Sequence, residues 1–236
     1  MNLVVDFGNT FIKAALFEAS HLKQSFYNIA EADLKLVEKE HSPNRILVSS
    51  VSKSKEDVRE IFKTSEIVFL ESTLPLPFQI NYKTPQTLGL DRIAGVAGAQ
   101  ELFPNENALV IDMGTCITYD FIDANSVYHG GGISPGMKMR FKALHNFTAK
   151  LPLIEPEEDV ELTGQSTKES ILSGIIYGIS AEIDGIIRMY SDKCAHLRII
   201  ICGGDAKFFE NKLKAGIFAA PELVLMGLNR ILLYNA

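Results

Sequence analysis

The alternation of apolar and polar positions divides this chain into short buried strands and amphipathic helices. Two runs of β-branched and other apolar residues, beginning at Leu3 and Leu109, have the continuous hydrophobicity of buried strands. Elsewhere apolar residues recur three or four positions apart, as at Leu34 and Val37, which is the spacing of a helix with one buried face. Because the two patterns alternate along the first part of the chain, we expect a protein of the α/β class.

The expected elements follow from these patterns and from the residues that start and stop them. The first half predicts a helix over 31–39, a strand over 44–51, a helix over 54–62, a strand over 66–70, a proline-punctuated connection over 73–90 and a helix over 91–103. The second half predicts a glycine-rich turn at 130–136 followed by a helix, a long helix over 166–190, a strand, Gly-Gly turn and helix over 197–209, and a terminal helix from 221. Ser166, with Glu169 three residues later, has the capping-box pattern at the start of the long helix.

An internal repeat indicates a duplicated architecture. Residues 3–13 read LVVDFGNTFIK, and residues 109–119 read LVIDMGTCITY. Each copy has a buried run, Asp-x-Gly, a threonine within two residues and a second apolar stretch, which together predict a strand, a tight turn and a returning strand. We therefore expect two lobes, 1–105 and 106–236, with a hinge near residues 104–107. A chance coincidence of two common Asp-x-Gly turns is the alternative.

Composition and charge restrict the class of protein. The chain has 236 residues, of which 47% are hydrophobic and 22% charged, so it can bury a substantial core. Its formal net charge of −6 argues against a general binder of nucleic acid or of membrane surfaces. Three cysteines without a CxxC pair argue against a disulfide framework and a zinc site. The N-terminus does not read as a signal peptide and no run of about 18 apolar residues occurs, so we expect a reduced cytoplasmic protein without a membrane span.

The segment Asp6–Lys13 is the first candidate binding site. Its glycine permits a tight turn in which successive backbone N–H groups can hold an anion, Thr10 adds a hydroxyl and Lys13 a positive charge. Asp6, at the end of a strand, could hold Mg²⁺ together with phosphate oxygens. The alternative is a plain hairpin in which Asp6 caps the turn. Asp112–Thr115 repeats this chemistry, and two such loops facing each other across a cleft would grip a polyphosphate and its cation.

Three further segments carry candidate chemistry. Gly130–Gly136 and Cys202–Asp205 are dense in glycine, so each either lets the backbone approach a ligand or packs one element closely on another. Asp91 and Arg92 stand side by side after the proline-punctuated connection. They form a solvated ion pair or a helix cap, or they act as a general base beside a clamp for a carboxylate or phosphate.

Taken in order, these motifs resemble those of the type III pantothenate kinases, which belong to the superfamily of hexokinase, actin and the heat-shock ATPases. The resemblance covers essentially the whole chain and is carried by DFGNTFIK at 6–13, NYKTPQTLGLDR at 81–92, DMGTCITYD at 112–120, GGGISPG at 130–136, GQSTKESILSGIIYG at 164–178, ICGGDA at 201–206 and PELVLMGL at 221–228. A single Asp-x-Gly motif is shared across the superfamily. The ordered set, above all LGLDR and GGGISPG, is specific.

The resemblance implies a duplicated ribonuclease-H-like fold of the actin-like ATPase kind, with two lobes around a nucleotide cleft, that works as a homodimer. The implied reaction is the ATP-dependent phosphorylation of pantothenate to 4′-phosphopantothenate, the first step of coenzyme A biosynthesis. The implied cofactors are ATP with Mg²⁺ and a monovalent cation, K⁺ or NH₄⁺. The pantothenate site would lie near the subunit interface.

The resemblance also assigns individual residues. Asp91 would accept the proton, Asp6 would lie close to the Mg²⁺ of ATP, and Asp112 would hold the monovalent cation. ATP would be contacted by Asp6, Phe7, Gly8, Asn9, Thr10, Phe11, Ile12, Lys13 and Thr115. Pantothenate would be bound by Tyr82, Gly89, Leu90, Asp91, Arg92 and, from the partner subunit, Thr167.

The second loop departs from the family pattern at Cys116 and Ile117, where members more often carry alanine and threonine. Because Asp112, Thr115 and Thr118 are retained, we expect the function of the loop to survive. Two other functions stay open on the sequence alone. One is a kinase of another small alcohol on the same scaffold, and the other is a nucleotide-binding regulatory or accessory protein.

Overall fold

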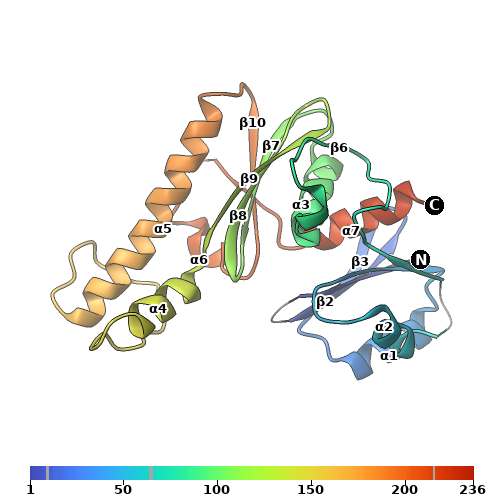
Figure 1. Ribbon diagram of the computed structural model, residues 1–236, viewed down its shortest axis with the longest axis horizontal. Helices are drawn as coiled ribbons and strands as arrows, with labels where there is room; N and C mark the ends of the chain where they lie inside the picture. Colours follow the sequence, from blue (N-terminus) through green and yellow to red (C-terminus); the bar gives the residue numbers. More distant parts are fainter. Residues whose placement is uncertain (9–10, 64–65, 215) are drawn as a thin grey trace. The chain divides into compact units, whose positions relative to one another are not determined.

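The computed structural model describes residues 1–8, 11–63, 66–214 and 216–236, and the chain forms two compact units (Figure 1). The first unit contains Met1–Asn105, Ala124–His129 and Glu222–Ala236, and the second contains Glu106–Asp123 and Gly130–Pro221. The first division between the units follows Asn105. The terminal segment belongs to the first unit, so the second unit ends at Pro221 and not at the C-terminus.

A five-stranded sheet forms the centre of the first unit. Its strand order is β3-β2-β1-β4-β5, in which β1 pairs antiparallel with β2 and parallel with β4. The strand, turn and returning strand predicted from the first copy of the repeat are β1 and β2. The bounds of the strands are β1 Asn2–Phe7, β2 Ile12–Glu18, β3 His21–Tyr27, β4 Arg45–Ser50 and β5 Glu66–Phe69.

The sequence predicts helices over 31–39 and 54–62, and the structure has α1 (Glu31–His41) and α2 (Lys55–Ile61) there. Both lie below this sheet in Figure 1. Their buried side chains, including Leu34 and Val58, join Leu3 of β1 in one apolar cluster. These side chains are almost fully excluded from water, and burial of an aliphatic side chain of this size contributes about 1.5–3 kcal/mol. The cluster therefore fixes the strand that carries the first candidate loop.

Helices α3 (Leu90–Leu102) and α7 (Leu223–Tyr234) pack side by side in the first unit, although they come from the middle and the end of the chain (Figure 1). Glycine permits this approach, because a Cβ added at Gly227 would lie 1.7 Å from the carbonyl oxygen of Ala94. Helix α7 also packs against β1, β2 and β4. These contacts explain why the end of the chain returns to the first unit.

The proline-punctuated connection contains two short elements that the sequence patterns do not predict. Strand β6 (Gln79–Ile80) pairs parallel with the start of β9, and η1 (Pro85–Thr87) is a single 3₁₀ turn. The backbone N–H of Asn81 donates to the carbonyl oxygen of Tyr128 at 2.8 Å. A two-residue strand has no period to detect, and its partner lies far along the chain. The connection is thereby held in the first unit.

The second unit is built on strands in the order β11-β10-β7-β8-β9. Strand β7 pairs antiparallel with β8 and parallel with β10, so the second copy of the repeat forms the same hairpin as the first. Strand β9 begins in the first unit and ends in the second. The bounds are β7 Asn107–Met113, β8 Cys116–Ile122, β9 Val127–Pro135, β10 Leu197–Cys202 and β11 Phe218–Ala219.

The prediction of a glycine-rich turn at 130–136 is wrong. All but the last of these residues belong to strand β9, which is a neighbour of β8 in the sheet. A Cβ added at Gly131 would lie 1.6 Å from the carbonyl oxygen of Tyr119. Glycine occurs here because two backbones approach closely, which is one of the few reasons for glycine inside a strand. The sequence signal for a turn and for such an approach is the same.

The helices of the second unit are α4 (Met137–Asn146), α5 (Thr167–Ser191) and α6 (Ala206–Glu210). The hydroxyl of Ser166 accepts the backbone N–H of Glu169 at 3.3 Å, as the predicted capping box requires. The Glu169 carboxylate accepts the N–H of Gln165 at 2.7 Å instead of that of Ser166, so the box closes one residue further out.

Helix α5 is long and apolar enough, by length and composition alone, to cross a membrane. Half of its most apolar window is buried within the protein, however. Its isoleucines, among them Ile179 and Ile183 with no exposed surface, pack in the apolar core of the second unit with residues of β7, β8 and β10. An apolar face that packs on a sheet accounts for the composition of this helix.

Candidate functional site

The first candidate loop joins β1 to β2 in the first unit. Asp6 lies opposite Lys13 in the antiparallel register and opposite Ser49 of β4 in the parallel one. Burial raises the pKa of the Asp6 carboxyl above its usual value, although the charge of Lys13 and a hydrogen bond from Ser49 act in the opposite direction. Asn9 and Thr10, which the sequence assigns to ATP, lie outside the described residues.

A second carboxylate of the first unit interacts with this loop. Asp91 lies exposed in the first turn of α3, and its charge raises the pKa of Asp6 further. One oxygen of Asp91 accepts the backbone N–H of Arg92 at 2.8 Å, so the side chain is fixed at the start of the helix. A Cβ added at Gly89 would lie 2.5 Å from that oxygen, so glycine leaves room for it. The structure thus places Asp91 near enough to Asp6 for its charge to act on the Asp6 carboxyl.

The other residues that the sequence assigns to pantothenate are divided between the units. Tyr82 packs near Tyr128 with ring centroids 6.3 Å apart, Leu90 starts α3, and Arg92 is buried with 7% of its surface exposed. All of these lie in the first unit. Thr167 is the exposed first residue of α5 and lies in the second unit.

The second candidate loop joins β7 to β8 in the second unit and lies against the turn Cys202–Asp205. Gly203 has a φ of +91°, and a Cβ added there would lie 2.4 Å from a carboxylate oxygen of Asp112. Both the positive φ and the lack of space require glycine. The backbone N–H of Asp205 donates to the carbonyl oxygen of Met113 at 2.9 Å. The turn is therefore tied directly to the loop.

The end of β9 also packs against the loop between β7 and β8. The backbone N–H of Gly136 donates to the carbonyl oxygen of Thr115 at 3.2 Å. A Cβ added at Gly136 would lie 2.4 Å from the carbonyl oxygens of both Gly114 and Thr115. Thus both glycine-dense segments that the sequence left open between packing and binding pack on the loop. An added Cβ at Gly204 would meet nothing within 4 Å, so that part of the backbone stays open.

Asp205 and Lys138 are polar residues of this region that sequence reasoning did not assign. Burial raises the pKa of Asp205, and the positive charge of Lys138 in the first turn of α4 opposes that rise. The position of Asp205 directly after the Gly-Gly turn was the sequence feature that could have identified it as a site residue. Lys138 carried no signal, because its approach to Asp205 depends on how α4 and α6 leave the sheet.

Metal binding is restricted by the donors that are present. Within the described residues, no three His, Cys, Asp or Glu side chains gather to hold a metal ion. Asp6 supplies a carboxylate, which is the donor that Mg²⁺ uses when phosphates and water complete its shell. The donor set therefore fits Mg²⁺ bound together with a nucleotide.

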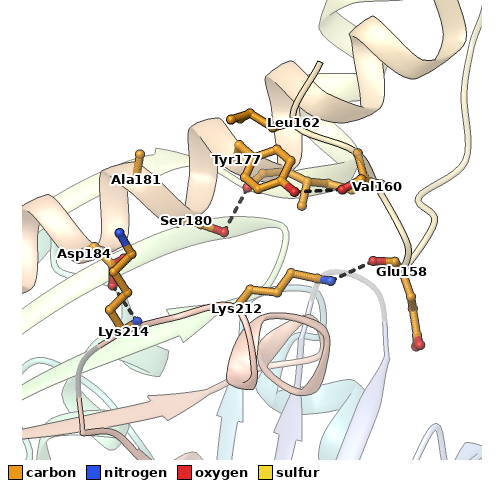
Figure 2. Close-up of a pocket in the computed structure, with 10 residues that line it drawn as sticks. Glu158, Val160, Leu162, Tyr177, Ser180, Ala181, Asp184, Lys212 and Lys214 are labelled. Atoms are coloured by element: carbon orange, nitrogen blue, oxygen red, sulfur yellow. Dashed lines mark hydrogen bonds between the residues drawn. The ribbon is translucent and has the colours of Figure 1, made fainter. Parts of the chain in front are cut away.

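A cavity of about 450 Å³ lies along α5 in the second unit (Figure 2). Tyr177 on α5 donates its hydroxyl to the carbonyl oxygen of Val160 at 2.8 Å, and Lys212 donates to that of Glu158 at 2.7 Å. The lining contains none of the residues that the sequence assigns to ATP or pantothenate.

Comparison with known proteins identifies the relatives of the chain. A family model described as type III pantothenate kinase matches residues 2–189. A type III pantothenate kinase of Cytophaga hutchinsonii is 44% identical over 236 residues, with all of both chains covered. One of Christiangramia forsetii is 46% identical over 243 residues, covering 100% of this chain and 99% of the relative.

Solved structures establish the fold. A Campylobacter jejuni protein assigned to the Baf family of transcriptional activators superposes with a TM-score of 0.67 at 23% identity, covering 99% of this chain and 98% of its own. Component A of (R)-2-hydroxyglutaryl-CoA dehydratase from Acidaminococcus fermentans gives a TM-score of 0.52 at 11% identity, covering 99% of this chain and 96% of its own. The expected fold, a duplicated ribonuclease-H-like architecture of the actin-like ATPase kind, is confirmed.

The raised pKa of Asp6 predicts a stability gain on neutralisation. Since the folded state holds this proton more tightly than the unfolded chain, ionisation lowers stability as the pH rises from about 4, the usual pKa of aspartate, through the folded pKa. Asp6→Asn should therefore raise the free energy of unfolding at pH 7 without nucleotide or divalent cation, and the gain should shrink at pH 4. Urea unfolding at both pH values measures it, with Asp33→Asn on α1 as the control. A lower free energy of unfolding for Asp6→Asn at pH 7 would contradict a raised pKa for Asp6.

Proposed function

Because the chain belongs to the type III pantothenate kinase family, we propose that it transfers the γ-phosphoryl group of ATP to the primary hydroxyl of pantothenate. The product is 4′-phosphopantothenate, and the enzyme is a phosphotransferase with an alcohol group as acceptor at the first step of coenzyme A biosynthesis. The observation that carries this proposal within the chain is the placement of Asp91 near Asp6 in the first unit. Asp91 is exposed, which supports a role toward the substrate, and Asp6 is partly buried, which supports a role toward a cation.

Pantothenate offers a primary hydroxyl at one end and a carboxylate at the other. Asp91, exposed at the start of α3, meets the hydroxyl, while Arg92 supplies a guanidinium for the carboxylate. Tyr82, Gly89 and Leu90 complete the pantothenate contacts in this unit. The local hydrogen bond from the N–H of Arg92 supports the role of Asp91, because it holds the carboxylate in one orientation before substrate binds.

In the transfer step, the hydroxyl oxygen forms a bond to the γ-phosphorus as the bond from that phosphorus to the β,γ-bridging oxygen breaks. The electron pair leaves with ADP, and the hydroxyl proton passes to Asp91. The transition state of such transfers is loose, so alignment and charge neutralisation contribute more than early deprotonation. A carboxylate is too weak a base to ionise an alcohol beforehand. Asp91 therefore orients the oxygen and takes its proton late.

The two glycine loops bind ATP in this proposal. The segment Asp6–Lys13 and Thr115 would contact its phosphates, and Asp6 would help to hold the Mg²⁺. Burial makes Asp6 costly to ionise and the charge of Asp91 adds to that cost, which supports this role because a nearby cation would relieve the cost. Bound Mg²⁺ supplies neutralisation of phosphate charge. Asp112 would hold a monovalent cation, K⁺ or NH₄⁺.

We further propose that the enzyme is a cytoplasmic homodimer whose pantothenate site receives Thr167 from the partner subunit. The surface of α5 near Thr167 supports a close helix contact, because Gly174 and Gly178 are exposed and an added Cβ at either would meet nothing within 4 Å. Small residues let helix backbones approach one another. The three cysteines are free thiols, which fits a reducing compartment.

Asp91→Asn should abolish most turnover while leaving nucleotide binding and the fold intact. The amide keeps an oxygen to accept the Arg92 N–H but cannot take a proton, so kcat should fall about 100-fold or more. The measurement is pantothenate-dependent release of ADP, with calorimetric binding of ATP as the second readout. Glu101→Gln at the other end of α3 is the matched control. A near-normal kcat in Asp91→Asn would remove Asp91 from the role of proton acceptor.

Subunit mixing tests the shared site. Thr167→Trp and Asp91→Asn homodimers should each be inactive, because each lacks one half of every site. Equal mixing after subunit exchange should restore about a quarter of wild-type activity, since half of random dimers are mixed and each keeps one intact site of two. Native mass spectrometry of the mixture is the control for exchange, because the two variants differ in mass and a mixed dimer has an intermediate mass. A mixture that stays inactive while exchange is demonstrated would place Thr167 and Asp91 in the same subunit's site, or Thr167 outside it.

A further inference from the structure

A network of three side chains links α5, α4 and β8 within the second unit. The Glu182 carboxylate on α5 accepts one hydrogen bond from the Tyr119 hydroxyl at 2.9 Å. Its other oxygen pairs with the Arg140 guanidinium on α4 at 2.6 Å. No sequence motif connects these residues, and they lie on three separate elements.

The Arg140 guanidinium also holds the end of β9. Its Nε donates to the carbonyl oxygen of Pro135 at 2.8 Å, and the same terminal nitrogen that meets Glu182 donates to the Ser134 hydroxyl at 3.0 Å. One planar group thus fixes two consecutive residues directly before Gly136. A lysine could not do this, because it lacks the rigid fork of donors.

Gly136 is the next link toward the candidate loop. It donates its N–H to the carbonyl oxygen of Thr115, and no side chain fits between the two backbones. The loop itself is tight, since the N–H of Gly114 donates to the carbonyl oxygen of Cys116 at 3.0 Å. Because these backbones are in direct contact, a displacement of Ser134–Pro135 also displaces Thr115.

Tyr119 ties the network to the same loop by a second route. It lies opposite Ile111 in the β7–β8 register, one residue before Asp112. Its ring is buried, with 2% of the residue exposed. Burial and the hydrogen bond to Glu182 raise the pKa of the Tyr119 phenol well above its usual value, so it stays a neutral donor. The network therefore reaches the loop both through β9 and through β8.

The ion pair between Arg140 and Glu182 orients the two side chains more than it stabilises the folded protein. The side chains of Arg140 and Glu182 retain 21% and 27% of their exposure. Burial opposes ionisation of Glu182, but hydrogen bonds from Arg140, Ser134 and Tyr119 prevail and keep the pKa of Glu182 below its usual value. Partly buried ion pairs of this kind contribute little net stability, because desolvation offsets most of their attraction.

We propose that Glu182 and Arg140 are positioning residues that set the geometry of the loop Asp112–Cys116 for the phosphates of ATP and its monovalent cation. This proposal rests on the function proposed above for that loop. The two side chains do not touch substrate. They act through the end of β9 and through Tyr119, and they define where the Thr115 backbone and the Asp112 carboxylate stand.

Glu182→Gln tests the proposal, because it retains the shape and a hydrogen-bond acceptor but leaves Arg140 without its anion. We expect the Kd for Mg-ATP, measured by calorimetry in K⁺, to rise about tenfold, as is typical when an outer partner of a binding group is lost. The KM for ATP and the K⁺ concentration for half-activation should rise in parallel. The KM for pantothenate should stay within about twofold, since its assigned contacts lie in the first unit except Thr167, which stands about four turns from Glu182 at the start of α5.

Matched variants separate positioning from folding. Asp184→Asn removes a carboxylate from the same helix, one that accepts the backbone N–H of Lys214 at 3.1 Å, and should leave the Kd unchanged. Arg140→Lys keeps the charge without the fork and should give an intermediate Kd. The Kd for Mg-ATP of the double variant Glu182→Gln/Arg140→Lys should not exceed that of the weaker-binding single variant. Both substitutions disturb the same ion pair, so their effects should not add. Circular dichroism and unfolding midpoints identify any variant that fails to fold.

The outcomes distinguish this proposal from the proposed function. A folded Glu182→Gln variant that binds Mg-ATP within twofold of wild type would overturn the positioning role. So would an equal rise in the KM values for ATP and pantothenate, which would indicate general loosening. If wild type binds Mg-ATP but does not phosphorylate pantothenate, the proposed function fails while the calorimetric comparison still decides the positioning role. If wild type binds no Mg-ATP, both proposals fail.

Discussion

The approach of two glycine backbones to the loop between β7 and β8 is the constraint around which the second unit is arranged. Gly203 faces the Asp112 carboxylate, and Gly136 faces the carbonyl oxygens of Gly114 and Thr115, in each case with no room for a Cβ. Helix α4 begins directly after Gly136, and α6 begins shortly after Gly203. Three segments far apart in the chain thus meet at one tight turn, with Lys138 in the first turn of α4 and Asp205 directly before α6.

Much of this fold could be predicted from local patterns. The buried runs at Leu3 and Leu109 and the Asp-x-Gly that follows each specify the hairpins β1–β2 and β7–β8, because strand, turn and return are encoded within a few residues. The failures have a common cause, which is dependence on distant partners. Gly131 removes a side chain between β8 and β9, whereas locally it looks like a turn residue. The return of α7 to the first unit depends on its packing against α3, for which neither helix alone carries a signal.

The candidate site divides in the same way. Asp6, Asp91 and Asp112 stand in motifs, and the sequence identifies each of them separately. The burial of Asp6, which raises the cost of ionising it, and the smaller contribution of Asp91 are visible only when β1 and the start of α3 are placed together. The partners Glu182 and Arg140 carry no motif at all, since their meeting depends on how α5 crosses α4. Residues that act through backbone contacts are therefore the ones that sequence reasoning misses.

The function proposed for this chain, transfer of phosphate from ATP to pantothenate, is tested by ³¹P NMR of the purified protein with Mg-ATP, with and without pantothenate, in K⁺ and then in Na⁺. We expect a new phosphate monoester that forms only with pantothenate, with an equal amount of ADP, and that falls sharply when Na⁺ replaces K⁺. ADP that appears without the ester, or no ADP in either salt, would exclude pantothenate kinase activity. Ester formation that is indifferent to the cation would keep the kinase and remove the cation site at Asp112.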